Sequence, residues 1–355
     1  MMLGDLGATV LKVERPGTGD DTRVWGPPYD DAGEATYFQA VNRNKSSIAL
    51  DLRRREDLAK AEELIVDSDV VVENFRPGVM DRLGLGYERL REQNAKLIYC
   101  SINGFGSGRG ARLAGYDLLV QALGGLMSIT GEPDGDPQKV GVAIVDVLAG
   151  LFATVGILAA VNHRMHGGEG QHIEVDLLSS LLASLVNQGT AYTIAGVVPA
   201  RMGNAHPSIA PYELLATASG GLVLAVGTDR QFATLCRILG EERLATEGRF
   251  RTNSDRVAHR AQLRSELEGL LLRGTAQDWA RKLTAAGVPA GLVNDIPAAF
   301  ALAESLGLEP IVSIPRASGS PARLTRNPIR LSQTPARYDL PPPRLPRGES
   351  CHSRA

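Results

Sequence analysis

Residues 46–75, "SSIALDLRRREDLAKAEELIVDSDVVVENF", contain the pattern that decides the fold. Two short runs rich in apolar and β-branched residues, 46–52 and 69–75, enclose a segment with the spacing of an amphipathic helix, 55–68. Short strands that alternate with such helices are typical of βαβ units, in which the strands run parallel. The stretch therefore predicts an α/β fold with a parallel sheet.

The same alternation continues on both sides of this stretch. It predicts a helical start at 1–8, strands at 9–14, 96–102 and 171–178, and helices at 78–95 and 179–189. A hairpin with a Ser-Gly-Gly turn at 212–228 begins a different pattern, followed by helices at 229–240, 256–273 and 275–287. We therefore predict a large domain over 1–200, a smaller α+β domain over 205–305, a return to the large domain over 306–340, and a disordered, Pro-rich tail over 341–355.

Composition narrows the class of protein. A chain of 355 residues is long enough for two domains, and its net charge of -2 argues against a nucleic-acid partner bound through bulk positive charge. The three cysteines are odd in number and widely spaced, so they predict neither a disulfide framework nor a zinc site, and a reducing cytoplasm fits. Asp5 comes too early for a signal peptide.

The longest apolar run, residues 140–161, "VGVAIVDVLAGLFATVGILAAV", contains one charged residue, Asp146. Its length would allow it to span a bilayer. The pattern is better explained by a buried strand or approach segment at 140–145, followed by a core helix that ends at Gly167–Gly168. We therefore expect no membrane partner.

Asp146 has two interpretations at this point. As an N-cap, it would accept hydrogen bonds from the amides of Leu148 and Ala149 and have only a structural role. Alternatively, the helix N-terminus would hold the carboxylate ionised in an apolar pocket, where it is a usable nucleophile towards an activated acyl group. Periodicity does not separate the two, because both place Asp146 at the start of a helix.

Motifs for nucleotide chemistry are missing. The sequence contains no P-loop, and "GFGSGRG" (104–110) has the glycines of a dinucleotide-binding loop but no helix pattern after it. This weakens ATP-dependent and dinucleotide-dependent activities. We also expect that a chain beginning with a helix lacks the strand that should open its sheet.

Together these segments resemble the class III CoA-transferases, the formyl-CoA transferase family, which also contains the α-methylacyl-CoA racemases. The resemblance covers nearly the whole chain and rests on an ordered set of segments, 3–23, 42–52, 69–88, 114–131, 140–161, 250–263 and 285–295. The segments "GDDTRVWGPP" (19–28), "NRNKSSIAL" (42–50) and "GNAHPSIAPYE" (203–213) look closest to the succinyl-CoA-dependent dicarboxylate transferases, such as succinate–hydroxymethylglutarate CoA-transferase.

The resemblance implies a Rossmann-like large domain, a small domain and an interlocked homodimer. It also implies that Asp146 is the nucleophile, which forms an aspartyl anhydride and then an aspartyl thioester with coenzyme A (CoA). The CoA thioester is then a substrate, and no permanently bound cofactor and no metal are expected.

Further residues are assigned through the resemblance. Those that match CoA contacts are Arg15, Leu50, Arg53, Asn74, Phe75, Arg76 and Arg82. Arginine suits phosphate because its planar guanidinium pairs with two oxygens, although each arginine has the alternative of a solvated surface charge. Tyr116 and Asp117 match the substrate pocket, and their structural alternative is a capped core helix with Tyr116 buried.

The loop 203–211, which includes Gly203, matches a glycine-rich loop over the site, and His206 in it is a candidate ligand for a distal carboxylate. Its structural alternative is a histidine that stabilises the loop.

Two rival functions stay open. The racemases carry a histidine at the position of Tyr116, and tyrosine, with a pKa near 10, is a poor base; an acyl-CoA racemase is therefore the less favoured enzyme. A truncated, inactive CoA-binding homologue is the non-enzymatic alternative.

Overall fold

The computed structural model describes residues 1–346, so part of the predicted tail, 347–355, lies outside the described residues. The chain divides into two compact units. The first consists of Met1–Val120, Ile144–Ser184 and the chain from Phe300 onward, and the second of Gln121–Ala143 and Leu185–Ala299. The domain boundaries predicted from the sequence remain a prediction.

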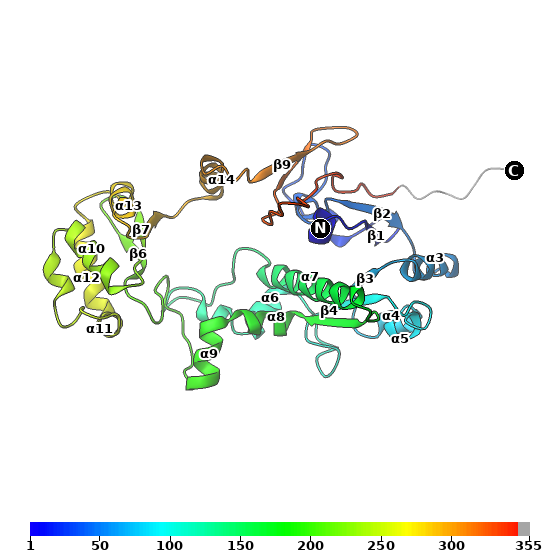
Figure 1. Cartoon of the computed structure of the whole chain (residues 1–355), viewed down its shortest axis with the longest axis horizontal. Coiled ribbons are helices and arrows are strands. Elements are labelled where there is room, and N and C mark those ends of the chain that lie inside the picture. The colour runs from blue at the N-terminus through cyan, green and yellow to red at the C-terminus, as the bar shows by residue number, and fades with distance from the viewer. Residues whose placement is uncertain (347–355) are drawn as a thin grey trace. The chain divides into compact units, whose positions relative to one another are not determined.

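Figure 1 shows the elements of the first unit. They are α1 (Met2–Asp5), β1 (Val10–Glu14), η1 (Asp21–Val24), α2 (Thr36–Ala40), β2 (Lys45–Ala49), α3 (Arg55–Val66), β3 (Val70–Glu73), α4 (Val79–Arg82), α5 (Tyr87–Leu90), β4 (Ile98–Asn103), α7 (Ile144–Met165), β5 (His172–Asp176), α8 (Leu177–Ser184), β9 (Ile311–Ile314) and β10 (Ala322–Thr325). Helix α6 (Asp117–Leu123) begins in it, and α14 (Ile296–Ser305) ends in it.

The second unit contains a three-stranded antiparallel sheet and the helices that cover it. Its elements are η2 (Met127–Ile129), α9 (Val186–Ala195), β6 (Tyr212–Ala216), β7 (Gly221–Ala225), α10 (Asp229–Ile238), η3 (Glu242–Ala245), α11 (Asn253–Ala258), α12 (Arg260–Leu271), α13 (Ala276–Ala285) and β8 (Ala290–Leu292). Strands β6, β7 and β8 pair in that order, so the predicted hairpin is confirmed. Phe232, Leu267 and Trp279 bring α10, α12 and α13 into one core with the sheet.

The expected parallel pairing is confirmed, but the strands belong to two sheets. Strands β1 and β2 pair in parallel from Val10↔Lys45 to Glu14↔Ala49. Strands β3, β4 and β5 form a separate parallel sheet in that order. The stretch 46–75 therefore forms the predicted strand, helix and strand, yet β2 and β3 on either side of α3 do not share a sheet.

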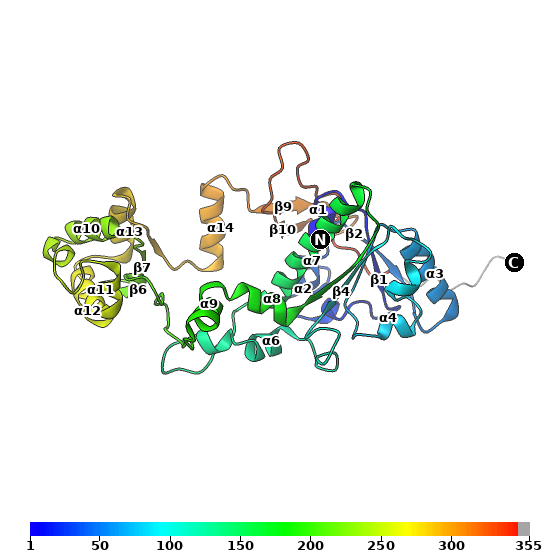
Figure 2. The same ribbon diagram turned by 60° about the horizontal axis from the view of Figure 1, so that its bottom comes forward.

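Helices cover both faces of the β3–β4–β5 sheet. On one face, Val71 and Tyr99 pack with residues of α3, including Ala61 and Leu64. On the other face, Cys100 packs with Ala153 and Ile157 of α7, and Figure 2 shows α7 lying along β4 and β5. A sheet with helices on both sides is the architecture that βαβ units produce.

Helix α7 packs on the sheet through one narrow stripe. Its buried residues recur every three or four positions and are Val145, Ala149, Ala153, Ile157 and Ala160. Small side chains at this spacing let a helix approach a sheet closely. By length and composition alone the helix is apolar enough to cross a membrane, so the predicted absence of a membrane partner stays a prediction.

Three predicted elements differ from the structure. Residues 140–145 form no strand; the approach segment there is irregular, and α7 begins at Ile144. The helix predicted at 78–95 is split into α4 and α5, because Gly84 between them has a left-handed φ of 72°. The helix predicted at 256–273 is broken at His259, and the earlier helix α11 starts at a capping box of Thr252 and Asp255.

A hydrogen-bond network explains why the polar segment "NRNK" (42–45) is largely buried. Arg43 is 1% exposed and donates from Nε and Nη2 to the two carboxylate oxygens of Asp5, at 2.9 and 2.6 Å. The side-chain amides of Asn44 and Asn327 donate to the same carboxylate. A buried ion pair needs such additional hydrogen bonds to offset the loss of hydration. The network joins α1, the start of β2 and the segment after β10.

Candidate active site

Asp117 caps the N-terminus of α7. Its Oδ1 accepts hydrogen bonds from the backbone N–H groups of Val145 at 2.8 Å and Asp146 at 3.4 Å. Asp146 is the third residue of the helix, so the N-cap interpretation of Asp146 was wrong. The first-turn amides are satisfied by a carboxylate from another helix, α6, which the local sequence did not indicate.

The Asp146 carboxylate accepts no hydrogen bond in the part of the chain that the structure describes. Asp146 is exposed at the surface of the single chain, yet the protein around it partly removes the carboxylate from water. This desolvation, with a smaller contribution from the charge of Asp117, raises the pKa of Asp146 from 3.8 to about 6. The surroundings therefore favour protonation more than the helix N-terminus alone would suggest. At pH 7 the group is still largely ionised and, without a partner, is free to react.

Tyr37 lies close to both carboxylates. Burial raises the pKa of its phenol, and the charges of Asp146 and Asp117 raise it further. The ring lies edge-on to Trp25, with centroids 5.3 Å apart. A phenol that stays protonated beside a nucleophile is a hydrogen-bond donor for an oxygen that gains charge during the reaction. Sequence reasoning missed Tyr37, although the quoted segment "GDDTRVWGPP" contains its neighbour Trp25.

Tyr116 precedes α6 and is 64% exposed. The structural interpretation, in which this residue is buried in a core helix, was therefore wrong. The fully buried residues of the helix are Val120 and Gln121. Tyr116 directly precedes Asp117, which caps α7. Its predicted role in the substrate pocket stays a prediction.

The first group of predicted CoA contacts follows β1 and β2. The amide of Leu50 donates to the carbonyl of Glu14 at 2.9 Å, so Arg15 and Leu50 lie at the same edge of that sheet. Leu50 is 6% exposed and packs in the core beside α3. Arg15 forms an ion pair with Asp21. Arg53 is paired through two hydrogen bonds, of 2.8 and 2.9 Å, with Asp51.

The second group follows β3. Asn74, Phe75 and Arg76 are exposed directly after the strand, and Arg82 is exposed at the end of α4. Within residues 1–346, Arg76 and Arg82 form no ion pair, in contrast to Arg15 and Arg53. The loop is shaped by the amide of Phe75, which donates to Glu73 at 2.9 Å. The carboxyl ends of parallel strands are where α/β proteins bind ligands.

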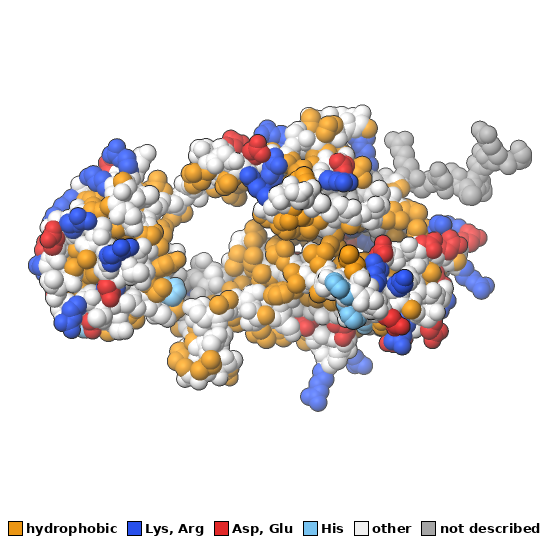
Figure 3. Space-filling view, in the orientation of Figure 1, with side chains coloured by type: hydrophobic (Ala, Val, Ile, Leu, Met, Phe, Trp, Pro, Cys, Tyr) orange, Lys and Arg blue, Asp and Glu red, His pale blue; other side chains and the backbone are white. Residues whose placement is uncertain are grey.

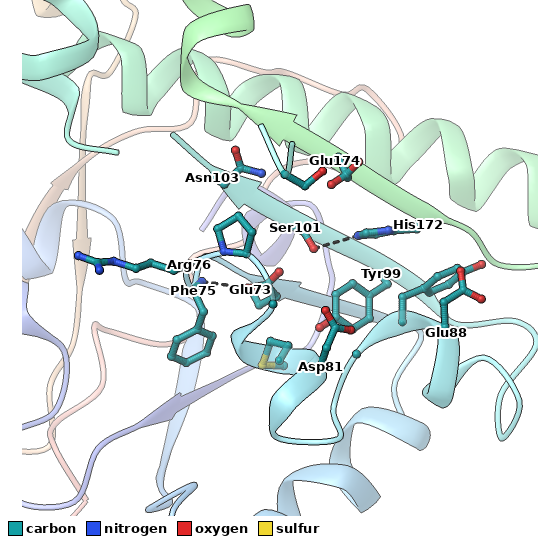
Figure 4. A pocket seen from close by; sticks show the side chains of 16 residues that line it. Glu73, Phe75, Arg76, Asp81, Glu88, Tyr99, Ser101, Asn103, His172 and Glu174 are labelled. Carbon is teal, nitrogen blue, oxygen red and sulfur yellow. Dashed lines mark hydrogen bonds between the residues drawn. The ribbon is translucent and has the colours of Figure 1, made fainter. Parts of the chain in front are cut away.

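A pocket of about 240 Å³ lies beside this loop. Its walls combine aromatic rings with carboxylates, and its lining includes Glu73, Phe75, Arg76, Asp81, Tyr87, Glu88, Tyr99, Ser101, His172 and Glu174. Figure 4 shows the Arg76 side chain running away from the carboxylates of Asp81 and Glu88. Phosphates are repelled by such carboxylates, so the guanidinium of Arg76 is better placed for them than the interior of the pocket.

The loop 203–211 belongs to the second unit, and residues of the same unit hold it in place. Asn253 and Arg260 donate to the carbonyls of Ser208 and Pro207, at 2.8 and 3.2 Å. The His206 ring packs on Tyr212, and its Nδ1 accepts from the amide of Ser208 at 3.1 Å. Gly203 has a left-handed φ of 59°, which favours glycine. The structure therefore gives His206 a loop-stabilising contact and leaves Nε2 as the proton-bearing nitrogen.

Within residues 1–346, no group of three or more His, Cys, Asp or Glu side chains is arranged to hold a metal ion.

The chain belongs to CoA-transferase family III, whose family model matches residues 1–349. The recognition of a class III CoA-transferase from its sequence segments is thereby confirmed, and the enzyme class with it. The comparison does not test the individual site residues, which stay predictions.

Two named CoA-transferases and one solved structure are similar to this chain. The chain is 48% identical over 306 residues to the succinate–glutarate CoA-transferase of Agrobacterium fabrum, covering 84% of this chain and 76% of the relative. It is 42% identical over 302 residues to the human succinyl-CoA:glutarate CoA-transferase, covering 85% of this chain and 69% of the relative. A CAIB/BAIF family protein from Brucella suis has a similar solved structure, with a TM-score of 0.84 and 43% identity, covering 97% of this chain and 90% of the other.

Proposed function

We propose that the protein moves CoA from succinyl-CoA, or a similar donor, to a dicarboxylic or branched carboxylic acid through covalent intermediates on Asp146. The substrate class is supported by relatives named for succinate and glutarate. The observation that carries the mechanism is the Asp146 carboxylate, which is unpartnered, at the start of α7, and has a pKa of about 6.

Each step exchanges one acyl bond for another. An oxygen of Asp146 attacks the donor thioester carbonyl, which expels CoA thiolate and leaves a mixed anhydride. The thiolate then attacks the aspartyl carbonyl, releasing the donor acid and forming an aspartyl–CoA thioester. The acceptor carboxylate attacks this thioester, expels the thiolate and forms a second mixed anhydride with Asp146. The thiolate then attacks the acceptor's acyl carbonyl in that anhydride, which gives the new acyl-CoA and restores the Asp146 carboxylate. No ATP is consumed, because one thioester replaces another.

Tyr37 and Asp117 support this chemistry in different ways. The protonated phenol of Tyr37 is a donor for the carbonyl oxygen that becomes negative in each tetrahedral intermediate. Asp117 holds the amide of Val145 and so fixes the start of the helix that carries Asp146. Its charge also makes Asp146 more basic and therefore a stronger nucleophile once ionised.

Anhydrides hydrolyse, so the site needs protection from water. In the single chain, several apolar side chains of α7 are exposed, including Val147, Leu151, Val155 and Leu158. Figure 3 shows hydrophobic side chains gathered over the region of α7. Apolar patches of this kind mark protein interfaces. We therefore propose a homodimer in which a second copy covers this face; whether the copies interlock is part of the same proposal.

CoA binding is proposed to use the arginines in two ways. Arg76 and Arg82, which form no ion pair within the described residues, are available to phosphate at once. Arg15 and Arg53 have to exchange Asp21 and Asp51 for phosphate oxygens. Ion pairs exposed to solvent contribute little to stability, so a doubly charged phosphate can displace the carboxylate. His206 is proposed to donate from Nε2 to the distal carboxylate of the acceptor.

The deciding experiment follows CoA esters by mass spectrometry. The protein is incubated with succinyl-CoA and a panel of acids that includes glutarate, oxalate, mesaconate and a monocarboxylic control. We expect exchange onto a dicarboxylic acid and an acyl or CoA adduct on the peptide that contains Asp146. Asp146→Asn should retain CoA binding and lose both exchange and adduct. Full exchange by this variant would exclude the mechanism.

A second measurement separates the rival activity. Deuterium uptake at C2 of a 2-methylacyl-CoA without exchange onto free acids would indicate a racemase instead.

The cellular location is also a proposal. A reducing cytoplasm is supported by Cys100 and Cys236, which are buried free thiols. Burial raises the pKa of these thiols to about 11 and about 12.

A further inference from the structure

Tyr37, the proposed donor to the developing oxyanion, lies on a very short helix. Helix α2 contains the five residues Thr36–Ala40, and no side chain caps its N-terminus. A helix of this length is unstable in water by itself, because its few hydrogen bonds do not offset the conformational entropy lost in forming the first turn. The direction of the Tyr37 side chain therefore depends on the residues that pack on α2.

One of these residues is Arg23, which covers the buried side of α2. Its guanidinium carbon lies 3.8 Å from the centre of the Phe38 ring, and Phe38 is 1% exposed. A cation over an aromatic face is attracted by the electrons of the ring. Successive residues of a helix are about 100° apart around its axis, so the contact that holds Phe38 also sets the direction of Tyr37.

Arg23 is itself fixed by the carboxylate of Glu14 at the end of β1. Its Nε and Nη2 donate to the two oxygens of Glu14, each at 2.8 Å, and the two side chains are 10% and 1% exposed. The hydroxyl of Ser47 and the amide of Asp20 donate to the same carboxylate, at 2.5 and 2.9 Å. Burial acts to raise the pKa of Glu14, but these hydrogen bonds outweigh it and lower the pKa below its usual value. The carboxylate therefore stays ionised and holds the guanidinium in one place.

The pair of Arg23 and Glu14 joins three parts of the candidate site. Arg23 comes two residues before Trp25, whose ring lies edge-on to that of Tyr37. Glu14 comes directly before Arg15, a predicted CoA contact. The pair therefore connects the end of β1, where CoA is proposed to bind, to both aromatic rings.

We propose that Arg23 is a positioning residue for CoA transfer, which acts through Phe38 to aim the phenol of Tyr37. The inference rests on the proposed function, in which that phenol donates to the carbonyl oxygen that becomes negative. Arginine suits the task because its planar guanidinium pairs with a carboxylate along one edge while its face lies on an aromatic ring.

Arg23→Lys tests the proposal, because lysine keeps the charge but lacks the planar group. The variant should fold, since α2 has a second anchor: the Gln39 side chain donates to Asp30 at 2.8 Å and accepts from Arg316. We expect kcat for CoA transfer to fall roughly tenfold while KM changes little, because a misdirected donor weakens catalysis more than binding.

Arg249→Lys is the matched control. Arg249 also lies over a phenylalanine ring, that of Phe250 at 4.9 Å, and its Nε donates to Glu247 at 2.6 Å. It belongs to the second unit, away from α2 in the chain, and its replacement should leave kcat and KM unchanged.

A double-mutant cycle with Tyr37→Phe separates positioning from a general structural role. If Arg23 acts through the phenol, Arg23→Lys has nothing left to misdirect once the phenol is removed. Tyr37→Phe should then have the same kcat with and without Arg23→Lys. Losses that multiply would overturn the proposal, and so would an unaltered kcat in either single variant.

Hydrogen exchange tests the contact without any substrate. The backbone amides of α2, including that of Gln39, which donates to the carbonyl of Ala35 at 3.4 Å, should exchange roughly tenfold faster in Arg23→Lys. Equal exchange in the two chains would overturn the proposal whatever their activity. Failure of the proposed function gives a different result, because the unaltered chain would then transfer no CoA to any acid while this exchange still reports on Arg23.

Discussion

At the scale of single residues, the arrangement of Asp146 and Asp117 makes activity depend on pH. The pKa of Asp146 is raised to about 6 by burial first and by the Asp117 charge second. Only the ionised carboxylate is a nucleophile, so exchange should fall as the pH drops through about 6 and level off above it. The rate of CoA exchange measured from pH 4.5 to 8 checks this.

Asp117→Asn tests the cause of this dependence. The amide keeps an oxygen that can accept from Val145 but removes the like charge, so the midpoint should move to lower pH. Glu63→Gln, on the exposed face of α3, is the matched control and should leave the profile unchanged. An unchanged midpoint in Asp117→Asn would mean that burial alone sets the pKa of Asp146.

Tyr37 gives a second prediction at this scale. Tyr37→Phe removes the phenol that lies near both carboxylates and keeps the ring beside Trp25. If the hydroxyl stabilises the developing oxyanion, kcat should fall by roughly 10²-fold while KM changes little. Tyr29→Phe, at a similarly exposed tyrosine on the segment between Trp25 and α2, is the control. A loss confined to KM would assign Tyr37 to substrate binding instead.

At the scale of elements, α7 has two apolar faces with different tasks. One packs on the sheet, and the other carries Val155, which is 65% exposed. Val155→Lys should leave the fold of the chain intact and shift the protein from dimer to monomer, because an unpaired charge would be buried in the interface. Light scattering coupled to size exclusion measures this, with Glu63→Lys on α3 as the control. A stable dimer in Val155→Lys would place the interface elsewhere.

The break between α4 and α5 depends on Gly84. Its φ of 72° is a conformation that side chains rarely adopt, and a Cβ there would meet Arg89 at 2.7 Å. Gly84→Ala should therefore lower the free energy of unfolding by about 1 kcal/mol or more. Gly269→Ala within α12, where a Cβ meets nothing within 4 Å, should be neutral or stabilising. Chemical denaturation of both variants gives the comparison, and equal effects would contradict the argument.

At the scale of the whole molecule, local patterns predicted the elements better than their partners. The stretch 46–75 forms its strand, helix and strand, because periodicity depends on neighbours along the chain. The separation of β2 from β3 into different sheets depends on contacts between distant segments, which periodicity does not contain. For the same reason the break at Gly84 was missed, since the glycine is compatible with a continuous helix pattern.

Contacts between distant segments also limited what the sequence could predict about the site. The sequence located Asp146 at the start of a helix but offered only Asp146 itself as a possible cap, because Asp117, the actual cap, is brought there by tertiary folding. Tyr37 was missed because an exposed tyrosine in a short helix has no distinctive spacing. The resemblance supplied the family, which the comparison confirmed, whereas the contacts of Arg15, Arg53 and Leu50 became visible only in the structure.

The ion pair between Asp5 and Arg43 has a consequence for synthesis on the ribosome. Its carboxylate also needs Asn327, and Arg43 donates to the carbonyl of Thr325 at 2.6 Å. The middle of the chain, residues 185–299, emerges before these partners and has a core of its own. The central unit can therefore fold while Asp5 and Arg43 still lack Thr325 and Asn327, and the network around Asp5 closes only after translation has passed residue 327.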